Sequence, residues 1–259
     1  MFDVLLGGYG AVLLFLAMLM FVELGRRFGR RRLDKEGEAF GRGVAPAESA
    51  VFALLGLLVA FTFSGAAARF EARRYLITQE ANDIGTAWLR IDMLPADTQS
   101  ELRGLFRLYA DARIASYGPK AGEAGVVEKR AEAAALQDAI WAKSVAALRR
   151  PDVVAGAAQV VVPGLNAMFD ITTTRATANE NHPPVAIFVL LAVLCVVGSL
   201  LFGYGAAPNP ERNWLHKLAF AGIMACTVFV ILDLEYPRAG WIRIDEADHV
   251  LVDVRRTMT

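Results

Sequence analysis

The apolar residues of this chain are segregated into blocks without a charged side chain, and this segregation constrains the fold more than any other feature. Three blocks are long, at residues 4–22, 49–68 and 185–207, and a shorter one lies at 218–232. A helix rises about 1.5 Å per residue, so about 20 apolar residues span the roughly 30 Å hydrocarbon core of a bilayer. Trp214 and Tyr236 flank the short block and suit the membrane interface. The pattern predicts four transmembrane helices, at about 4–24, 47–68, 184–206 and 215–235.

The charged residues collect between these blocks, and the longest charged stretch separates the second block from the third. We expect an all-α membrane protein with four transmembrane helices and a water-facing antiparallel helical bundle inserted between helices 2 and 3. The expected divisions are a transmembrane hairpin at 1–68, the extramembrane bundle at 69–182, a second transmembrane hairpin at 183–236 and a C-terminal tail at 237–259.

Apolar residues at helical spacing predict the buried faces of the bundle. The first helix continues the second transmembrane helix outward and ends at Pro95, and the next starts near Thr98, which has capping-box spacing to Glu101. Two more helices are expected at about 124–149 and 152–181, the last kinked at Pro163. These stripes either form the core of the bundle or pair between subunits. The stripes are Ile77, Ala81, Ile84, Trp88 and Ile91; Leu102, Leu105, Phe106 and Tyr109; and Val127, Ala131, Ala134, Trp141, Val145 and Leu148.

Polar residues of the first bundle helix and the C-terminal tail give weaker signals. Charged residues of this kind are usually exposed, so we expect a solvated face there. In the tail, residues 241–245 alternate between apolar and polar and predict a short strand. Four apolar residues then predict a short amphipathic helix. The polar face comprises Glu80, Asp83, Arg90 and Asp92, and the tail helix uses Val250, Leu251, Val254 and Met258.

Basic residues that follow the first apolar block predict the orientation in the membrane. Short loops rich in Lys and Arg stay in the cytoplasm, so the loop at 25–46 is expected there, where it also touches anionic lipid head groups. Four crossings then place both termini and the domain at 69–182 on the periplasmic side of a bacterial inner membrane. The basic residues are Arg26, Arg27, Arg30, Arg31, Arg32, Lys35 and Arg42.

Small residues recur at every fourth position of the second block and therefore lie on one face of the helix. Faces of this kind let membrane helices approach closely. The stripe is either a packing surface for a neighbouring helix or the wall of a pore. It comprises Gly56, Ala60, Ser64 and Ala68.

Charged residues mark the ends of the second and fourth transmembrane helices, which four crossings place on the same face of the membrane. Charges near hydrocarbon need partners, so we expect one of the two carboxylates at the fourth helix to pair with one of three arginines. The cluster is then either a clamp that fixes the domain to the membrane helices or a ring of charge at a pore mouth. It comprises Arg69, Glu71, Arg73, Arg74, Asp233 and Glu235.

Several functional classes lack support in the sequence. The chain has 27 basic and 27 acidic residues, which does not indicate a nucleic-acid binder. Both cysteines lie in apolar blocks, and the three histidines lie far apart, without the spacing of metal ligands. No phosphate-binding loop or hydrolase motif is present. We therefore expect neither an enzyme nor a bound metal or cofactor.

Three stretches together resemble the bacterial bestrophin-like family of membrane proteins, a domain of unknown function, over nearly the whole chain. The family resemblance implies a relation to bestrophins, which are pentameric anion channels with four membrane segments per subunit and a helical insert between segments two and three. The stretches are Phe61-Thr62-Phe63-Ser64 with Arg69, Glu71, Arg73 and Arg74; Gln79-Glu80-Ala81 through Arg90 to Leu94-Pro95; and Leu232-Asp233-Leu234-Glu235-Tyr236-Pro237-Arg238-Ala239-Gly240.

Two functions of different classes follow from these observations. The first is a homo-oligomeric ion channel or pore, suggested by the family resemblance, the small-residue stripe and the charged helix ends. The second is a non-transporting envelope protein whose helical bundle binds a partner or senses the state of the envelope. The near absence of charge within the membrane blocks favours the second, since transporters usually carry such groups.

Overall fold

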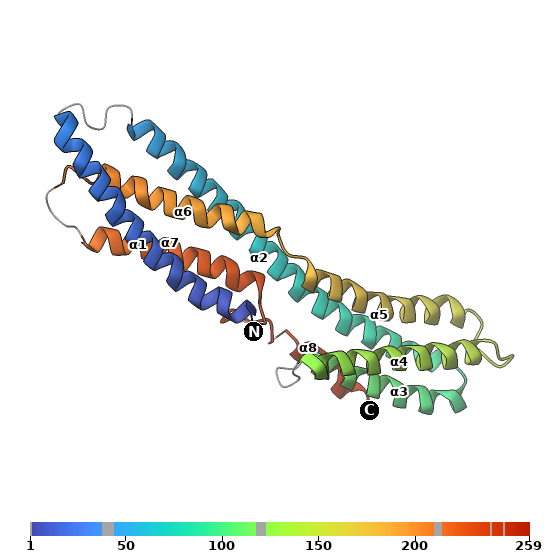
Figure 1. Cartoon of the computed structure of the whole chain (residues 1–259). Helices are drawn as coiled ribbons and strands as arrows, with labels where there is room; N and C mark the ends of the chain where they lie inside the picture. Colours follow the sequence, from blue (N-terminus) through green and yellow to red (C-terminus); the bar gives the residue numbers. More distant parts are fainter. Residues whose placement is uncertain (1, 38–43, 118–122, 210–213, 239, 246) are drawn as a thin grey trace. The chain divides into compact units, whose positions relative to one another are not determined.

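The computed structural model describes residues 2–37, 44–117, 123–209, 214–238, 240–245 and 247–259 (Figure 1). All regular structure in these ranges is helical, and none of these residues lies in a strand. The chain divides into two compact units. The first consists of Met1–Phe70 with His182–Arg243, and the second of Glu71–Asn181 with Ile244–Thr259.

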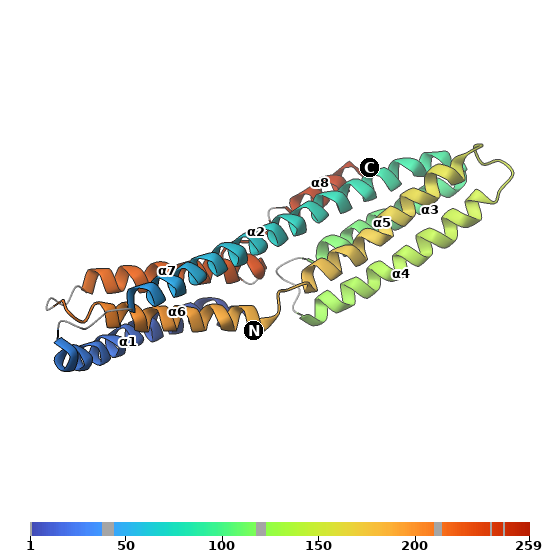
Figure 2. The same ribbon diagram turned by 90° about the horizontal axis from the view of Figure 1, so that it is seen from above.

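The first unit contains the helices that suit a membrane. They are α1 (Phe2–Glu36), the part of α2 (Val44–Arg90) up to Phe70, α6 (Val185–Gly205) and α7 (Trp214–Glu235). Each belongs to one of four segments long and apolar enough to cross a bilayer. The helices run alongside one another in both views (Figures 1 and 2), and α1 contacts both α6 and α7. Multi-pass contact with lipid follows from these four segments.

The expected loop at 25–46 is largely helical. Helix α1 continues to Glu36, and α2 already begins at Val44. The apolar block marks the membrane but not the helix end, because residues 26–35 contain strong helix formers and no proline. Arg42 lies outside the described residues.

Glycines let α1 and α6 pack backbone against backbone. A Cβ atom on Gly25 would lie 2.0 Å from the carbonyl oxygen of Leu200, and one on Gly203 would lie 1.9 Å from the carbonyl oxygen of Val22. Neither backbone can yield as a side chain could, so this crossing requires glycine on both helices. Such contacts are typical of membrane helix packing.

Apolar side chains from all four helices fill the core of the first unit. Met18 of α1, Leu55 of α2, Leu191 of α6 and Ile231 of α7 are fully or almost fully buried in one cluster. The ring of Phe52 packs edge-on against that of Phe220, with 6.0 Å between centroids. Burial of these side chains within the unit orients the remaining faces of the helices outward.

The second unit is a helical bundle. It contains α2 from Glu71 onward, the 3-10 helix η2 (Ile91–Met93), α3 (Ala96–Ala115), α4 (Glu123–Leu148), α5 (Ala157–Glu180) and α8 (His249–Thr257). Helix α2 is continuous from the apolar block into the bundle, as expected. The predicted stripes of α2 and α3 are in the core, where Ile77, Leu102, Phe106 and Tyr109 are fully buried.

The predicted stripe of α4 does not form the buried face of this helix within the bundle. Val127 is 67% exposed and Trp141 is 37% exposed, whereas Ala133 and Ile140 are buried. The many alanines of this helix make more than one face look apolar. Packing against α3 selects the face that carries Ile140.

Two local predictions also fail and one holds. Thr98 does not cap α3, because the helix begins at Ala96 and the Thr98 hydroxyl donates a hydrogen bond to the carbonyl of Pro95. Residues 241–245 do not form a strand, because the amides of Trp241 and Ile242 donate to a side chain of α7 instead. The amphipathic tail helix is confirmed as α8, which buries Leu251 and contacts α3.

Candidate functional site

Arg69, His182 and Glu235 form a charged cluster in the first unit. Arg69 Nε and Nη2 donate hydrogen bonds to Glu235 Oε2 at 2.9 and 2.7 Å, and Nε also lies 3.1 Å from Oε1. His182 Nδ1 lies 2.9 Å from the same Oε1. The Glu235 side chain has no exposed surface. The expected pairing of a carboxylate of the fourth transmembrane helix with an arginine after the second is therefore present.

Local sequence explains why these three side chains meet. Glu235 is the last residue of α7, and Arg69 directly follows the uncharged stretch of α2. The guanidinium of Arg69 lies back along its helix, where a Cβ atom on Gly65 would be only 3.2 Å from Nη1. His182 precedes two prolines that separate α5 from α6, and its ring lies 4.6 Å from that of Tyr236. Nothing in the sequence indicated a role for His182, because its partner Glu235 lies 53 residues further along the chain.

Asp233 has a different role from the one expected for it. Its carboxylate accepts hydrogen bonds from the backbone amides of Trp241, at 2.9 Å, and Ile242, at 2.6 Å. A Cβ atom on Gly240 would lie 1.6 Å from Asp233 Oδ1, so only glycine admits the carboxylate here. The motif that starts at Asp233 thus closes the segment after α7 onto the helix end.

Glu71, Arg73 and Arg74 of the predicted cluster belong to the second unit and have partners there. Arg73 is buried and donates to the carbonyls of Ala178 and Asn181, at 3.1 and 3.2 Å, which end α5. A cation is favourable there, because the carbonyls at a helix C-terminus carry partial negative charge. Arg74 pairs with Glu71 in an exposed contact of 3.0 Å along the same helix.

The small-residue stripe of α2 faces away from the rest of its own subunit. Gly56, Ala60, Ser64 and Ala68 are all exposed, and a Cβ atom on Gly56 would meet nothing within 4 Å. Phe61, next to the stripe, is 68% exposed. Of the four apolar segments, the one with α2 is the least buried. The stripe is therefore not a packing surface within the described part of the subunit.

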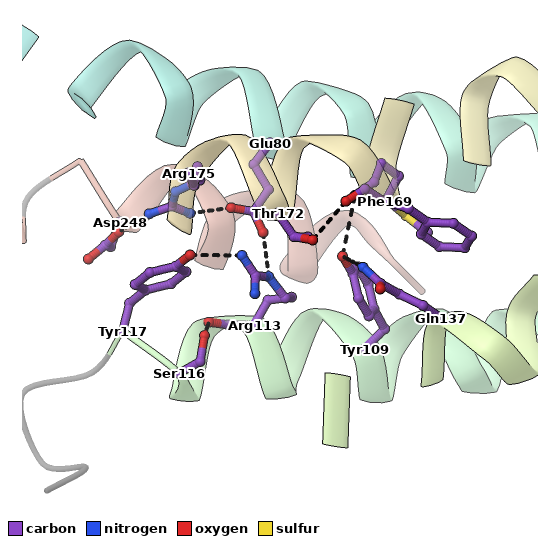
Figure 3. A network of polar contacts seen from close by, with 11 residues as sticks. Glu80, Tyr109, Arg113, Ser116, Tyr117, Gln137, Phe169, Thr172, Arg175 and Asp248 are labelled. Atoms are coloured by element: carbon purple, nitrogen blue, oxygen red, sulfur yellow. Dashed lines mark hydrogen bonds and ion pairs between the residues drawn. The ribbon is translucent and has the colours of Figure 1, made fainter. Parts of the chain in front are cut away.

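The second unit contains a buried ionic network that the sequence did not indicate. Figure 3 shows the Glu80 carboxylate approached by Arg113 of α3 and Arg175 of α5. Arg113 Nε donates to Glu80 Oε1 at 2.6 Å, and Arg175 Nη1 donates to the other oxygen. Arg175 also lies over the ring of Tyr117, 3.9 Å from its centroid. Glu80 is fully buried, so its assignment to a solvated face is wrong.

Two other residues of the predicted polar face, Arg90 and Asp92, also contact other parts of the second unit. Arg90 donates to the carbonyl of Val160 at 2.9 Å and lies in the space left by Gly164, where a Cβ atom would be 2.7 Å from Arg90 Nη1. Asp92 pairs with Arg103. The sequence around a charged residue does not show whether the residue will be buried against a partner on a distant helix.

Charge and burial shift the pKa values of this network. Glu80 lies outside the uncharged stretch of α2, and burial alone would raise its pKa, but the charges of Arg113 and Arg175 outweigh burial and lower it. Burial, followed by the charge of Glu80, raises the pKa of Asp83. Burial opposes the charge of Arg113, yet Glu80 raises the pKa of this guanidinium. The shifts of Glu80 and Arg113 both favour the charged form, so this pair is ionised at neutral pH.

A cavity of about 240 Å³ lies beside this network, between α3, α4 and α5. Arg113, Tyr117, Arg130, Gln137 and Thr172 contribute polar groups to its wall, and alanines of α4 and α5 leave the space. Such a polar cavity can hold water or a small polar ligand. Among the described residues, no group of three or more His, Cys, Asp or Glu side chains could hold a metal ion.

Comparison with known proteins identifies the family. The family model described as Bestrophin-like domain matches residues 12–248, which is most of the chain. No curated protein and no solved structure matches the chain. The matched region includes the small-residue stripe, the cluster around Glu235 and the Glu80 network. The chain therefore belongs to the bestrophin-like domain family.

Proposed function

We propose that the chain assembles with copies of itself into an ion channel or pore of bestrophin-like type. The observation that carries this proposal is the uncovered face of α2 with Gly56, Ala60, Ser64 and Ala68. Small residues of membrane helices are typical of close helix–helix contacts or of narrow passages. If this face contacted only lipid, small residues would offer no advantage there, because larger side chains make more van der Waals contacts with lipid.

The hydroxyl of Ser64 supports a polar or protein neighbour for this face. Thr62, on the same helix, donates a hydrogen bond to the carbonyl of Leu58 at 2.8 Å. Ser64 makes no hydrogen bond within the described part of the chain. A hydroxyl without a partner is costly in hydrocarbon, so water or a second subunit is the favoured neighbour.

The charged cluster suits the mouth of such a pore. Arg69 follows Ala68 directly, so an axis lined by α2 would bring a ring of Arg69 side chains close to its end. Rings of charged side chains select ions by sign. Glu235 and His182 hold the arginine in place, so the cluster can join α2 to α7 within the first unit and also contribute to a charged ring.

The orientation follows from the basic residues of α1. We place the Arg-rich end of α1 in the cytoplasm of a bacterial inner membrane, and both termini and the water-facing bundle in the periplasm. A membrane-impermeant thiol reagent applied to intact cells tests this placement. It should label Ser100→Cys in the exposed part of α3 and spare Arg31→Cys; the reverse pattern would invert the orientation.

Mass and symmetry of the solubilised full-length protein test the assembly. Native mass spectrometry with two-dimensional particle averages should give a ring of five or so subunits around an axis. A monomer, or a closed dimer without an axial opening, would contradict the channel. Ion flux into vesicles that contain the purified protein is the functional readout.

Cysteine scanning tests whether α2 lines the axis. In a background without Cys195 and Cys226, Gly56→Cys, Ala60→Cys and Ser64→Cys should react with a charged thiol reagent and lose flux. Leu190→Cys on α6 is the control, since Leu190 is also exposed in the subunit but does not belong to the small-residue stripe. Equal reaction at both helices would show that exposure in the subunit, and not a pore, determines access.

The cavity beside the Glu80 network favours a second candidate function, a non-transporting protein whose bundle binds a small polar ligand or a partner. Arg113 and Arg130 line the cavity and suit a carboxylate or another small anion. Two results would support the ligand-binding function over the channel. The protein would be a monomer without ion flux, and Ala134→Leu, which fills the cavity, would abolish stabilisation by the ligand.

A further inference from the structure

A hollow of about 410 Å³ lies at the C-terminal end of α1, which we place in the cytoplasm. It shares no described residue with the charged cluster or with the cavity of the bundle. We call it the basic hollow; it is lined by Phe28, Arg31, Arg32, Lys35 and Tyr204. We propose that the basic hollow binds the phosphate of an anionic phospholipid head group.

Helix geometry assembles the hollow. Phe28, Arg31, Arg32 and Lys35 are spaced by three, four and seven positions and therefore lie on one face of α1. The opposite wall is Tyr204 of α6. The two helices approach closely here, because a Cβ atom on Gly29 would lie 2.7 Å from the carbonyl oxygen of Tyr204. The glycine contact thus holds the aromatic ring beside the basic face.

The position along the helices matches the head-group layer. Tyr204 lies near the end of the uncharged stretch at 185–207, and its contact with Gly29 places Phe28 at the same level. The cations follow within two turns, at about 1.5 Å per residue. Aromatic rings favour the interface, and long basic side chains extend to reach phosphates. A lipid can therefore present its phosphate to the cations while its glycerol and upper acyl carbons contact the two aromatic rings.

Charge in the hollow favours an anion. Of the side chains that the structure describes, three cations and no acidic group line the hollow. Asp34 lies between Arg32 and Lys35 in the sequence but is not among the lining residues. Glu23 is held by other cations, since it lies 3.7 Å from Arg27 and 3.1 Å from Lys217. Guanidinium groups bind phosphate oxygens through two parallel hydrogen bonds, and basic pockets between membrane helices bind acidic lipid head groups. A free phosphate has the same chemistry but makes no use of the aromatic rings, which favours the lipid.

Lipid binding to the full-length protein tests the proposal. Detergent-solubilised protein is titrated with phosphatidylglycerol, phosphatidylcholine or inorganic phosphate, and bound lipid is counted by native mass spectrometry while thermal stability is recorded. Phosphatidylglycerol should remain bound and raise the unfolding temperature, and phosphatidylcholine should do neither. Equal binding of both lipids would overturn the proposal. Full stabilisation by inorganic phosphate alone would overturn the lipid as the source of the phosphate.

Matched variants separate the hollow from general positive charge. Arg31→Gln/Arg32→Gln should weaken phosphatidylglycerol binding at least about tenfold, because charge-assisted contacts to phosphate are lost. Arg27→Gln/Arg30→Gln removes the same charge from exposed positions of α1 outside the hollow and should bind as the wild type does. Equal losses in both pairs would reject a defined site. Should the first pair fail to fold, Lys35→Gln compared with Arg30→Gln makes the same distinction with one exposed charge.

Discussion

Arg69 and Glu235 are 166 residues apart, yet Arg69 Nε and Nη2 both donate to one oxygen of the Glu235 carboxylate, at 2.9 and 2.7 Å. The carboxylate has no exposed surface, and Arg69 and His182 both lie against it. The pair joins the point where α2 leaves its uncharged stretch to the end of α7. The ion pair therefore links the first helical hairpin of the membrane unit to the second.

Loss of one partner of this pair should destabilise the membrane unit strongly. Arg69→Gln leaves a buried carboxylate without its main cation, and we expect a loss of about 3–5 kcal/mol in the free energy of unfolding. Unfolding in mixed micelles with increasing denaturing detergent measures it. The double variant Arg69→Gln/Glu235→Gln should lose less than the sum of the two single variants, because the second change removes the unpaired charge.

The exposed pair of Glu71 and Arg74 is the control for this prediction. It lies within two turns of Arg69 on the same helix, and both side chains are at least half exposed. Arg74→Gln should change the free energy of unfolding by no more than about 0.5 kcal/mol, since exposed ion pairs contribute little. A loss as large as that of Arg69→Gln would show that general charge near the membrane, and not the buried pair, is responsible.

Acid should weaken the second unit through Glu80. The folded unit holds the pKa of Glu80 below its ordinary value, despite burial, because Arg113 and Arg175 stabilise the carboxylate. The unfolded chain therefore binds more protons in acid. The stabilisation is complete above the ordinary carboxyl pKa of about 4.3 and is lost as the pH falls through the lowered value. Hydrogen exchange of α3 and α5 peptides in the full-length protein should show this loss.

Two substitutions on α2 should separate this network from simple loss of acidic charge. Glu80→Gln leaves two buried arginines without their carboxylate, so protection of α3 should fall at neutral pH and should depend less on pH in acid. Asp83→Asn is expected to be neutral or slightly stabilising at neutral pH, because burial and the charge of Glu80 already raise the pKa of Asp83. Equal effects of the two changes would contradict a specific role for Glu80.

The sequence was sufficient for features that depend on a continuous stretch of chain. Uncharged blocks located α6 and α7 almost to the residue, and the spacing of Ile77, Ala81, Ile84 and Trp88 located the buried face of α2. The length of a membrane-spanning segment and the periodicity of a helix are properties of one continuous stretch, so the sequence alone predicts them. The uncharged block did not show that α1 extends to Glu36, because charge does not end a helix, whereas the continuation of α2 into the bundle was expected.

Features that depend on a distant partner could not be predicted in detail. The charged cluster was expected to contain an arginine–carboxylate pair, but nothing in the chain indicated His182 or that Asp233 binds backbone amides. Glu80 looked like a surface residue, because its partners lie on α3 and α5. The close crossing of α1 and α6 was missed because its glycines are divided between two helices.

The crossing of α1 and α6 predicts a sharp contrast between two glycines of one helix. Gly25→Ala should reduce folded yield and stability by about 1–3 kcal/mol or more, since its Cβ atom would overlap the backbone carbonyl of Leu200. Gly10→Ala on the same helix meets nothing within 4 Å and should be neutral or slightly stabilising. Fluorescence-detected gel filtration of heated samples compares the two. Similar behaviour of both variants would argue against backbone contact at this crossing.

The motif at the end of α7 should behave as one unit. Asp233→Asn weakens the acceptor for the amides of Trp241 and Ile242, and Gly240→Ala places a methyl group against the same carboxylate. Each change should release the segment after α7, with a loss of about 1.5–3 kcal/mol from charged hydrogen bonds. Limited proteolysis after Arg238 or Arg243 reports the release. The double variant should be little worse than either single one, because one cap is lost in each case. Additive losses would mean that Gly240 serves another contact, and altered ion flux with an intact cap would assign Asp233 to the pore mouth.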